Sequence, residues 1–344
     1  MLKNLFPNIN FSNVIEYLRS AENIVITTHI KPDGDAIGSA MALYYALKDM
    51  GKSVNIILNG SDCPIKYNFL PESQNIEQYK KNIHNTILHS ADAIILVDLS
   101  DLSRVQNMNT PISQSPAKKI LIDHHINPDK FDYVCSDENA IATGEIIFAL
   151  LKEANVKITK SISDALYCAI YTDSGGFRFP KTTPRTHLIA TSLLESGTKP
   201  NEIYDYIYNQ NSLAKIHIHG MSMASMETFL DGQLTFIIIT KEMLKQTNCT
   251  NEDTEELVQV ALSIKETQVA IMIREYVKTN ELKISLRSKG DINIQPIAVK
   301  FGGGGHINAA GCSLENISIK EAKQILIEEI KKNIFQKNKK NLEN

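Results

Sequence analysis

Four apolar runs in the first half of the chain alternate with segments of helical periodicity, and this alternation limits the fold more than any other feature. The runs cover residues 23–30, 53–58, 93–98 and 118–123. Their nearly continuous apolar character predicts strands that are buried on both faces, as in a parallel sheet. Helical segments between such strands predict an α/β fold with right-handed crossover connections.

Three of the four runs end in side chains that could bind a metal. His29 closes the first run and Asp98 closes the third. The fourth run leads into Asp123, His124 and His125. Because ligands of α/β sheets bind outside the carboxyl ends of the strands, we expect these side chains to meet at one edge of the sheet.

Most of these residues also have a purely structural explanation. The stretch THIKPDGDAIGSA holds His29, Asp33 and Asp35, but Pro, Gly and Asp are also turn residues. Asp98 could precede a helix cap, and Asp173 could close a turn before two glycines. A metal site, a general acid/base pair and an acidic turn are therefore all open interpretations. The triplet DHH is harder to explain structurally, because burying such groups without partners is unfavourable.

The joint occurrence of these groups favours chemistry over accidental turns. Carboxylates and imidazoles together suit Mn²⁺ or Mg²⁺ with water, and less often Zn²⁺. Their number is sufficient for two ions that share one carboxylate. Two ions about 3.5–4 Å apart can hold both the attacking and the leaving oxygen of an in-line phosphoryl displacement.

The second half of the chain has a different character. Strand-like segments cover residues 234–240, 268–277 and 281–288, and a terminal helix is expected from 318 to 334. This pattern predicts a smaller α+β domain. We expect three parts: a catalytic domain over residues 1–198, a helical linker over 199–231 and the smaller domain over 232–344.

A glycine run followed by His306 is the strongest feature of the smaller domain. Gly303, Gly304 and Gly305 lack side chains, so their backbone N–H groups can bind an anion. Phosphate is the anion that we expect there, and a flexible hinge is the alternative.

Two arginines are further candidates for phosphate binding. Arg287 ends an alternating strand, and its planar guanidinium suits bidentate contact with phosphate, although it could also be a solvated charge. Arg104 follows VDLSDLS and is expected near the metal side chains. Ser288 and Asn308 are weaker candidates.

Composition excludes several classes of protein. The formal net charge of −3 provides no global basic field for non-specific duplex binding. The five cysteines are scattered without a C-x-x-C pair, which fits a reducing cytoplasm. No apolar run approaches the ~18 residues that span a bilayer, and the N-terminus does not look like a secretion signal. We therefore expect a cytoplasmic protein without a membrane partner.

The motifs THIKPDGDAIGSA, VDLSD, LIDHH and YTDSGGF, in this order, resemble the four motifs of the DHH phosphoesterase superfamily. The run FGGGGHINAAG resembles the glycine-rich motif of the DHHA1 domain. Together they cover nearly the whole chain. Their arrangement is most similar to the NrnA-type oligoribonucleases, which often also act as phosphatases of 3′-phosphoadenosine-5′-phosphate (pAp).

The resemblance implies two Mn²⁺ ions, with Mg²⁺ or Co²⁺ as substitutes. Its metal ligands, carried over position by position, are His29 and Asp33 for the first ion, Asp35, His124 and Asp173 for the second, and Asp98 as the bridge. It also implies that His125 faces the substrate phosphate while Asp123 orients the neighbouring imidazole. The DHHA1 domain would then bind the far end of the substrate.

The implied function is Mn²⁺-dependent hydrolysis of oligoribonucleotides of two to five nucleotides to mononucleotides, together with removal of the 3′-phosphate of pAp. A metal domain linked to a phosphate-binding domain would favour short substrates over long polymers. A linear or cyclic dinucleotide phosphodiesterase and a non-catalytic nucleotide-binding protein are the alternatives. The run FGGGGH disfavours a pyrophosphatase. A homodimer is compatible with the sequence, which contains no feature that decides the oligomeric state.

Overall fold

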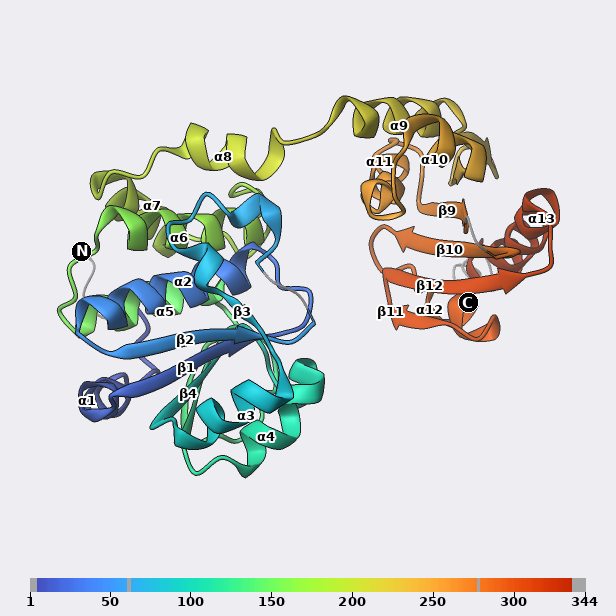
Figure 1. Cartoon of the computed structure of the whole chain (residues 1–344). Coiled ribbons are helices and arrows are strands. Elements are labelled where there is room, and N and C mark those ends of the chain that lie inside the picture. The colour runs from blue at the N-terminus through green and yellow to red at the C-terminus, as the bar shows by residue number, and fades with distance from the viewer. Residues whose placement is uncertain (1–4, 61–62, 277–278, 336–344) are drawn as a thin grey trace, which may run out of the picture. The chain divides into compact units, whose positions relative to one another are not determined.

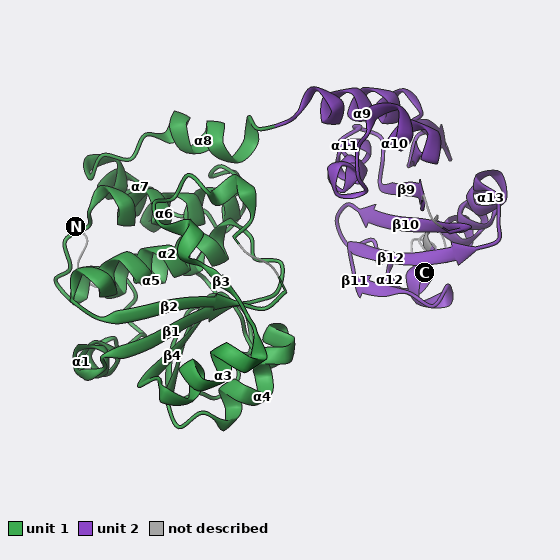
Figure 2. Ribbon diagram, in the orientation of Figure 1, with its two compact units in different colours: residues 1–210 green, residues 211–344 purple. Residues whose placement is uncertain are grey.

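The structure, a computed structural model, describes residues 5–60, 63–276 and 279–335. The chain divides into two compact units, residues 1–210 and 211–344, which Figure 2 shows in different colours. Each unit is built around its own six-stranded sheet. The predicted order of an α/β domain and a smaller α+β domain is thus confirmed. The predicted boundaries at 198 and 231 stay a prediction.

The first sheet is parallel throughout and has the strand order β3-β2-β1-β4-β5-β6. Its strands are β1 (Asn23–Thr28), β2 (Ser53–Leu58), β3 (Glu77–Gln78), β4 (Ala93–Val97), β5 (Lys118–Asp123) and β6 (Tyr133–Ser136). The four strands predicted from the apolar runs are β1, β2, β4 and β5. The strand order reverses between β1 and β4, and α/β sheets bind ligands at such a switch point.

Helices cover both faces of this sheet (Figure 1). The larger core lies under α1 (Ser12–Ser20), α2 (Gly34–Asp49), α5 (Thr143–Glu153), α6 (Lys160–Asp173), α7 (Pro184–Glu195) and α8 (Pro200–Tyr208). The opposite core lies under α3 (Lys81–Ser90), the 3₁₀ segment η3 (Leu102–Met108) and α4 (Asn109–Gln114). This double cover explains why the central strands are apolar on both faces.

Helices α2 and α6 pack closely at Gly38. A Cβ atom at this position would lie 2.4 Å from the carbonyl oxygen of Ala165. Gly38→Ala is therefore expected to lower the free energy of unfolding by about 1–3 kcal/mol, as overpacking does. Gly220→Ala is the matched control, because Gly220 also lies inside a helix, α9 (Leu213–Ala224), but faces open space.

The control substitution is expected to raise the free energy of unfolding by about 0.5–1 kcal/mol, since alanine loses less backbone entropy than glycine in a helix. Urea unfolding of both variants measures the two effects. Equal effects of the same sign would show that the contact between α2 and α6 does not constrain residue 38.

The second sheet is mixed and has the order β11-β12-β10-β9-β8-β7, in which β8 and β9 are parallel and the other pairs antiparallel. Its strands are β7 (Glu227–Phe229), β8 (Leu234–Ile239), β9 (Val269–Glu275), β10 (Glu281–Ser288), β11 (Gly304–His306) and β12 (Ala309–Glu315). The three predicted strands correspond to β8, β9 and β10. Residue 277, the predicted end of the second, lies outside the described residues.

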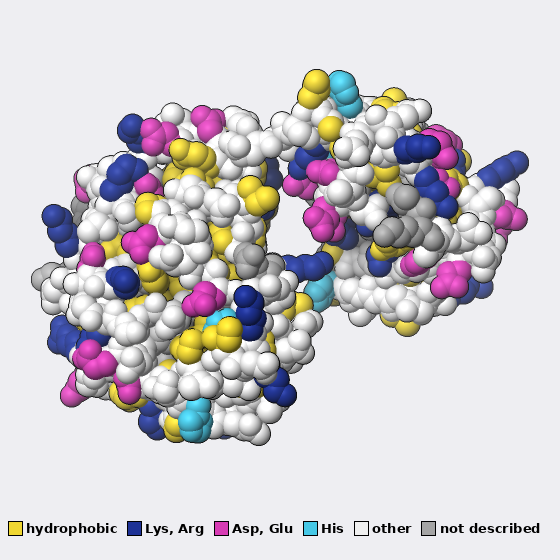
Figure 3. All heavy atoms as spheres, viewed as in Figure 1, with side chains coloured by type: hydrophobic (Ala, Val, Ile, Leu, Met, Phe, Trp, Pro, Cys, Tyr) yellow, Lys and Arg dark blue, Asp and Glu magenta, His cyan; other side chains and the backbone are white. Residues whose placement is uncertain are grey.

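Helices also cover both faces of the second sheet. One core lies under α9, α10 (Lys241–Thr247) and α11 (Leu257–Leu262), and the other under α12 (Gln295–Lys300) and α13 (Ile319–Ile330). Basic and acidic side chains are interspersed on the face shown in Figure 3, in keeping with the net charge of −3. Within the described ranges, no helix has the length and apolar character that crossing a membrane requires.

Candidate metal centre

Three strands of the first unit deliver side chains to one edge of the sheet, as the sequence predicts. His29 follows β1, Asp98 follows β4, and His124 follows β5. The ligand atoms of the described residues form three groups that share members, and within each group they lie within 4.8 Å of one another. The groups are His29, Asp33 and Asp98; Asp35, His124 and Asp173; and Asp98, His124 and His125.

The turn PDGD has a structural role in addition to any ligand role. Asp33 is the N-cap of α2, and its Oδ1 accepts hydrogen bonds from the backbone N–H groups of Asp35 and Ala36, each at 3.1 Å. Gly34 lets the start of α2 approach the end of α6, because a Cβ there would lie 2.3 Å from Oγ1 of Thr172. This close approach brings the turn beside Asp173.

Asp35 is buried and is held by the start of another helix. The backbone N–H of Thr143 donates to Oδ2 of Asp35 at 2.6 Å, and that of Gly144 donates to Oδ1 at 3.0 Å. The hydroxyl of Thr143 also donates to Oδ1 of Asp98 at 3.2 Å. The N-terminus of α5 thus stabilises negative charge at the site. Sequence reasoning missed these two residues, although a Thr-Gly pair at a helix start is a usable signal.

Asp98 occupies the centre of the cluster in an unfavourable backbone conformation. Its φ is +58°, which costs a non-glycine residue about 1 kcal/mol or more. Its Oδ2 lies 3.4 Å from Nε2 of His29, and its Oδ1 lies 3.5 Å from Nε2 of His124. The left-handed residue directly after β4 therefore places one carboxylate between His29 and His124.

Backbone carbonyls orient both imidazoles. Nδ1 of His29 lies 2.8 Å from the carbonyl oxygen of Ile30, and Nδ1 of His124 lies 3.3 Å from that of Ala140. These bonds place a proton on Nδ1 in each ring, so Nε2, which faces the carboxylates, is the atom that a metal ion would bind in place of a proton. A histidine that binds a metal commonly donates its other N–H group in this way.

The crowded carboxylates give the cluster an excess of negative charge. Burial disfavours the imidazolium of His124, but the hydrogen bond with Asp98 and the charges of Asp35 and Asp173 outweigh it and raise the pKa of His124 to about 10. Burial, with the Asp98 charge adding to it, raises the pKa of Asp173 to about 6. Burial likewise raises the pKa of Asp35. Such crowded carboxylates fit a hard divalent cation, which would neutralise them.

His125 is oriented by a carboxylate, whereas His29 and His124 are oriented by backbone carbonyls. Its Nδ1 donates to Oδ1 of Asp123 at 2.7 Å, and its Nε2 lies 3.3 Å from a terminal guanidinium nitrogen of Arg104. Asp123 is fully buried, and its Oδ2 has no hydrogen-bond partner among the described residues. The structure therefore brings the predicted Asp123, His125 and Arg104 together beside the metal ligands.

Asp123→Asn is expected to lower kcat about 10- to 100-fold while the bound-metal content stays the same, as with other groups that orient a site residue. The physical reason is that a neutral amide holds the Nδ1–H of His125 more weakly than a buried carboxylate does. Steady-state kinetics and metal analysis of the purified variant test this. A loss of bound metal would mean that Asp123 supports the ligands instead of His125.

The predicted substrate residues of the second unit lie on β10 and on the β11–β12 hairpin. Arg287 is half-buried, and its guanidinium donates to the carbonyl oxygen of Leu286 at 2.9 Å. Ser288 donates to the carbonyl oxygen of Ile292 at 2.6 Å and accepts from Asn308 at 2.9 Å. These bonds give Ser288 and Asn308 a structural role. Their predicted contact with substrate stays a prediction.

The glycine run forms the edge strand β11 and the turn before it. A Cβ at Gly303 would lie 2.1 Å from the carbonyl oxygen of Gly311, and one at Gly305 would lie 2.4 Å from that of Ala309. Close strand pairing therefore requires glycine at both positions. Gly304 and His306 are exposed and have no such requirement. The predicted binding of phosphate by Gly303, Gly304, Gly305 and His306 stays a prediction.

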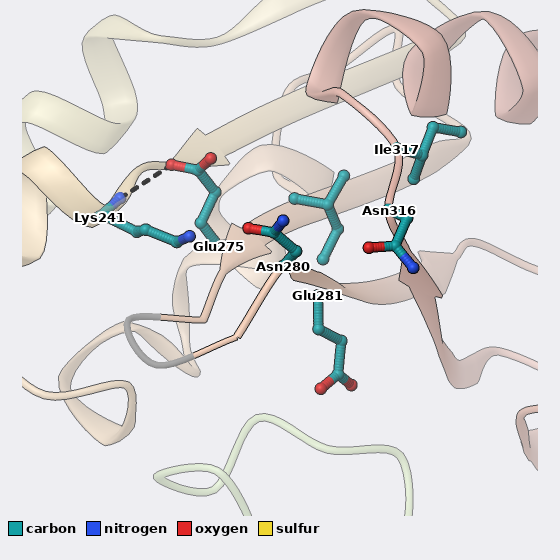
Figure 4. A pocket seen from close by; sticks show the side chains of 7 residues that line it. Lys241, Glu275, Asn280, Glu281, Asn316 and Ile317 are labelled. Atoms are coloured by element: carbon teal, nitrogen blue, oxygen red, sulfur yellow. Dashed lines mark hydrogen bonds between the residues drawn. The ribbon is translucent and has the colours of Figure 1, made fainter.

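The second unit also contains a pocket of about 340 Å³ at another end of its sheet (Figure 4). Its polar lining includes Lys241, Glu275 and Asn316, and the backbone N–H of Lys241 donates to Glu275 at 3.0 Å. None of the predicted substrate residues lines this pocket. The pocket and the glycine run are thus separate features.

Two family profiles match the chain. The DHH family, N-terminal domain, matches residues 23–170, and the DHHA1 domain matches residues 234–334. The chain is 29% identical to the "Bifunctional oligoribonuclease and PAP phosphatase NrnA" of Thermus thermophilus, covering 93% of both chains. It is 26% identical to the protein of the same name from Bacillus subtilis, covering 92% of this chain and 96% of that one.

Solved structures show the same fold. An exopolyphosphatase-related protein from Bacteroides fragilis is 30% identical with a TM-score of 0.85, covering 94% of this chain and 95% of that one. The exonuclease RecJ bound to manganese is 12% identical with a TM-score of 0.51, covering 90% of this chain and 91% of that one. The second likeness concerns the fold alone.

Proposed function

The chain belongs to the DHH family and carries a DHHA1 domain, and from this premise we propose that it is a metal-dependent phosphoesterase acting on short oligoribonucleotides. Its second proposed substrate is pAp, which it would convert to AMP and phosphate. The observation that carries the proposal is the set of three ligand groups in which Asp98 and His124 each occur twice. The names of the relatives that align along nearly the whole chain support the choice of substrate. As the scattered cysteines predict, we place the enzyme in the cytoplasm.

The proposed metals are two Mn²⁺ ions, with Mg²⁺ or Co²⁺ as substitutes. The first would be held by His29 and Asp33, the second by Asp35, His124 and Asp173, and both by Asp98. When bound, such ions act as Lewis acids that activate water and stabilise the charge that develops on phosphorus oxygens. Backbone hydrogen bonds to the imidazoles and to Asp35 hold these ligands in place before substrate arrives.

The remaining polar groups of the site have distinct proposed roles. Arg104 presents a planar guanidinium that can bind two oxygens of the scissile phosphate. The Nε2 atom of His125, which lies beside Arg104, would contact the phosphate or pass a proton to the leaving oxygen. Asp123 keeps the Nδ1 proton of His125 in place and stabilises its imidazolium form.

A product assay with Mn²⁺ and with EDTA tests the proposal. The substrates are pAp, a two-nucleotide RNA, the dinucleotide pApA, cyclic di-AMP and a long single-stranded RNA. EDTA-sensitive turnover of pAp and the two-nucleotide RNA, with little attack on the long strand, is the expected result. Turnover of cyclic di-AMP alone would move the function to a cyclic dinucleotide phosphodiesterase. Bound Mn²⁺ without turnover of any substrate would support a binding protein.

A further inference from the structure

An exposed phenylalanine and its arginine neighbour follow the candidate ligand Asp173 in the chain and have no role in the site described above. Helix α6 ends at Asp173, and a turn follows that contains Arg178 and Phe179. The side chain of Phe179 is 43% exposed. The guanidinium carbon of Arg178 lies over this ring, 5.4 Å from its centroid. An aromatic ring with a cation over it is therefore partly open to solvent in the turn that follows Asp173.

The turn holds Phe179 in a defined position. Gly175, Gly176 and Phe177 are three successive residues with φ of +58°, +71° and +67°. The carbonyl oxygen of Ser174 accepts from the backbone N–H groups of Arg178 and Phe179, each at 3.0 Å. This left-handed turn folds the chain back, so that a Cβ at Gly175 would lie 2.6 Å from Cζ of Phe179. The Phe179 ring thus packs against a residue two positions beyond Asp173.

Phe177 provides the contrast within the same turn. Its ring packs against those of Tyr167, Tyr171 and His187, with centroid separations of 5.9, 5.6 and 5.4 Å. Phe177 is therefore an anchor that joins the turn to α6 and α7. Packing on other rings accounts for the aromatic residue at 177, whereas Phe179 packs only on the turn itself and on Arg178 in the described contacts and stays 43% exposed.

We propose that Phe179, with Arg178 over its ring, stacks against the base of the nucleotide whose phosphate lies at Asp173. This inference rests on the proposed function, because it assigns a subsite to that reaction. A base is joined to its phosphate by one sugar, so a stacking ring must lie close to the metal ligands, and the ring of Phe179 approaches Gly175, two positions beyond Asp173. Stacking tolerates any base, since every base has a π face. The arginine adds a cation–π contact and a positive charge near the phosphates.

The test compares substrates with and without a base. The pairs are pAp with 1-deoxyribose 3,5-bisphosphate, and a two-nucleotide RNA with its fully abasic analogue. Phe179→Ala is expected to lower kcat/KM about tenfold or more on the natural substrates and to leave the abasic substrates unchanged. Phe179→Trp is expected to keep the activity on all of them. Phe179→Leu separates stacking from apolar bulk and should behave like the alanine variant.

Tyr204→Ala is the matched control, because Tyr204 is also 43% exposed but lies on α8. It is expected to change none of the rates. Suppose that the wild-type protein turns over pAp or RNA. If Phe179→Ala then lowers kcat/KM equally on the natural and the abasic substrates, or lowers it on neither, the stacking subsite is wrong. A wild-type protein that hydrolyses none of the substrates would instead overturn the proposed function, and the subsite with it.

Discussion

Asp98→Asn is expected to lower kcat/KM on the two-nucleotide RNA about a thousandfold, because a bound metal supplies several kcal/mol and each 1.36 kcal/mol is worth about tenfold. The carboxylate of Asp98 lies between the imidazoles of His29 and His124. Its loss removes the charge that two of the ligand groups share. Asparagine is the appropriate replacement, since it tolerates the left-handed backbone that residue 98 adopts.

Two measurements separate a metal role from a folding role. The bound Mn²⁺ of the variant, counted by metal analysis after dialysis, is expected to fall below that of the wild type. Asp101→Asn is the control from the same loop, because Asp101 caps η3 through the backbone N–H of Ser103 and belongs to none of the ligand groups. A variant at residue 98 with normal metal content and normal rates would remove Asp98 from the proposed centre.

The sequence predicts the parts of this fold that depend on local pattern. The strands β1, β2, β4 and β5 are apolar and buried, so their runs are visible in the sequence. The edge strand β3 has two exposed residues and no pattern to detect. The edge that gathers His29, Asp98 and His124 follows from the parallel topology. Local pattern therefore predicts both the central sheet and the place of the site.

The contacts that support the site could not be predicted in the same way. Thr143 and Gly144 bind the carboxylate of Asp35, which is more than 100 positions away in the chain. Such contacts depend on how α2 and α5 pack, and no local pattern encodes that packing. The glycine run illustrates the same limit, because the demand for glycine at 303 and 305 comes from a strand paired across a hairpin.

A buried ion pair supports the loop that orients His124. Glu145, in the first turn of α5, is fully buried, and its Oε2 accepts from Nε of Arg185 at 3.2 Å. Arg185 also donates to the carbonyl oxygen of Asn139 at 3.1 Å. The neighbouring carbonyl, that of Ala140, is the one that faces Nδ1 of His124. Arg185 thus joins α7 to both α5 and the loop beside the metal centre.

Arg185→Met is expected to lower the free energy of unfolding by about 3–5 kcal/mol at neutral pH, because it leaves the Glu145 carboxylate buried without its cation. The double variant Glu145→Gln/Arg185→Met is the control. It is expected to recover most of the loss, since a neutral pair carries no buried charge. Urea unfolding measures both. A double variant as unstable as the single one would mean that the packing of Arg185 on Phe6, 4.0 Å away, is what matters.

The loss of unfolding free energy in Arg185→Met should also depend on pH, and the pKa of Glu145 determines the direction of this dependence. Burial already raises the pKa of Glu145 above its ordinary value of 4.5, although Arg185 opposes this, so removing Arg185 raises it further. A raised folded pKa means that the folded state binds the proton more tightly than the unfolded chain does. The variant therefore regains stability as the pH falls from neutral towards 4.5 and loses it as the pH rises through the folded pKa. Unfolding curves of wild type and variant at a series of pH values should converge on the acid side. Parallel curves would show that the charge of Glu145 does not determine the loss.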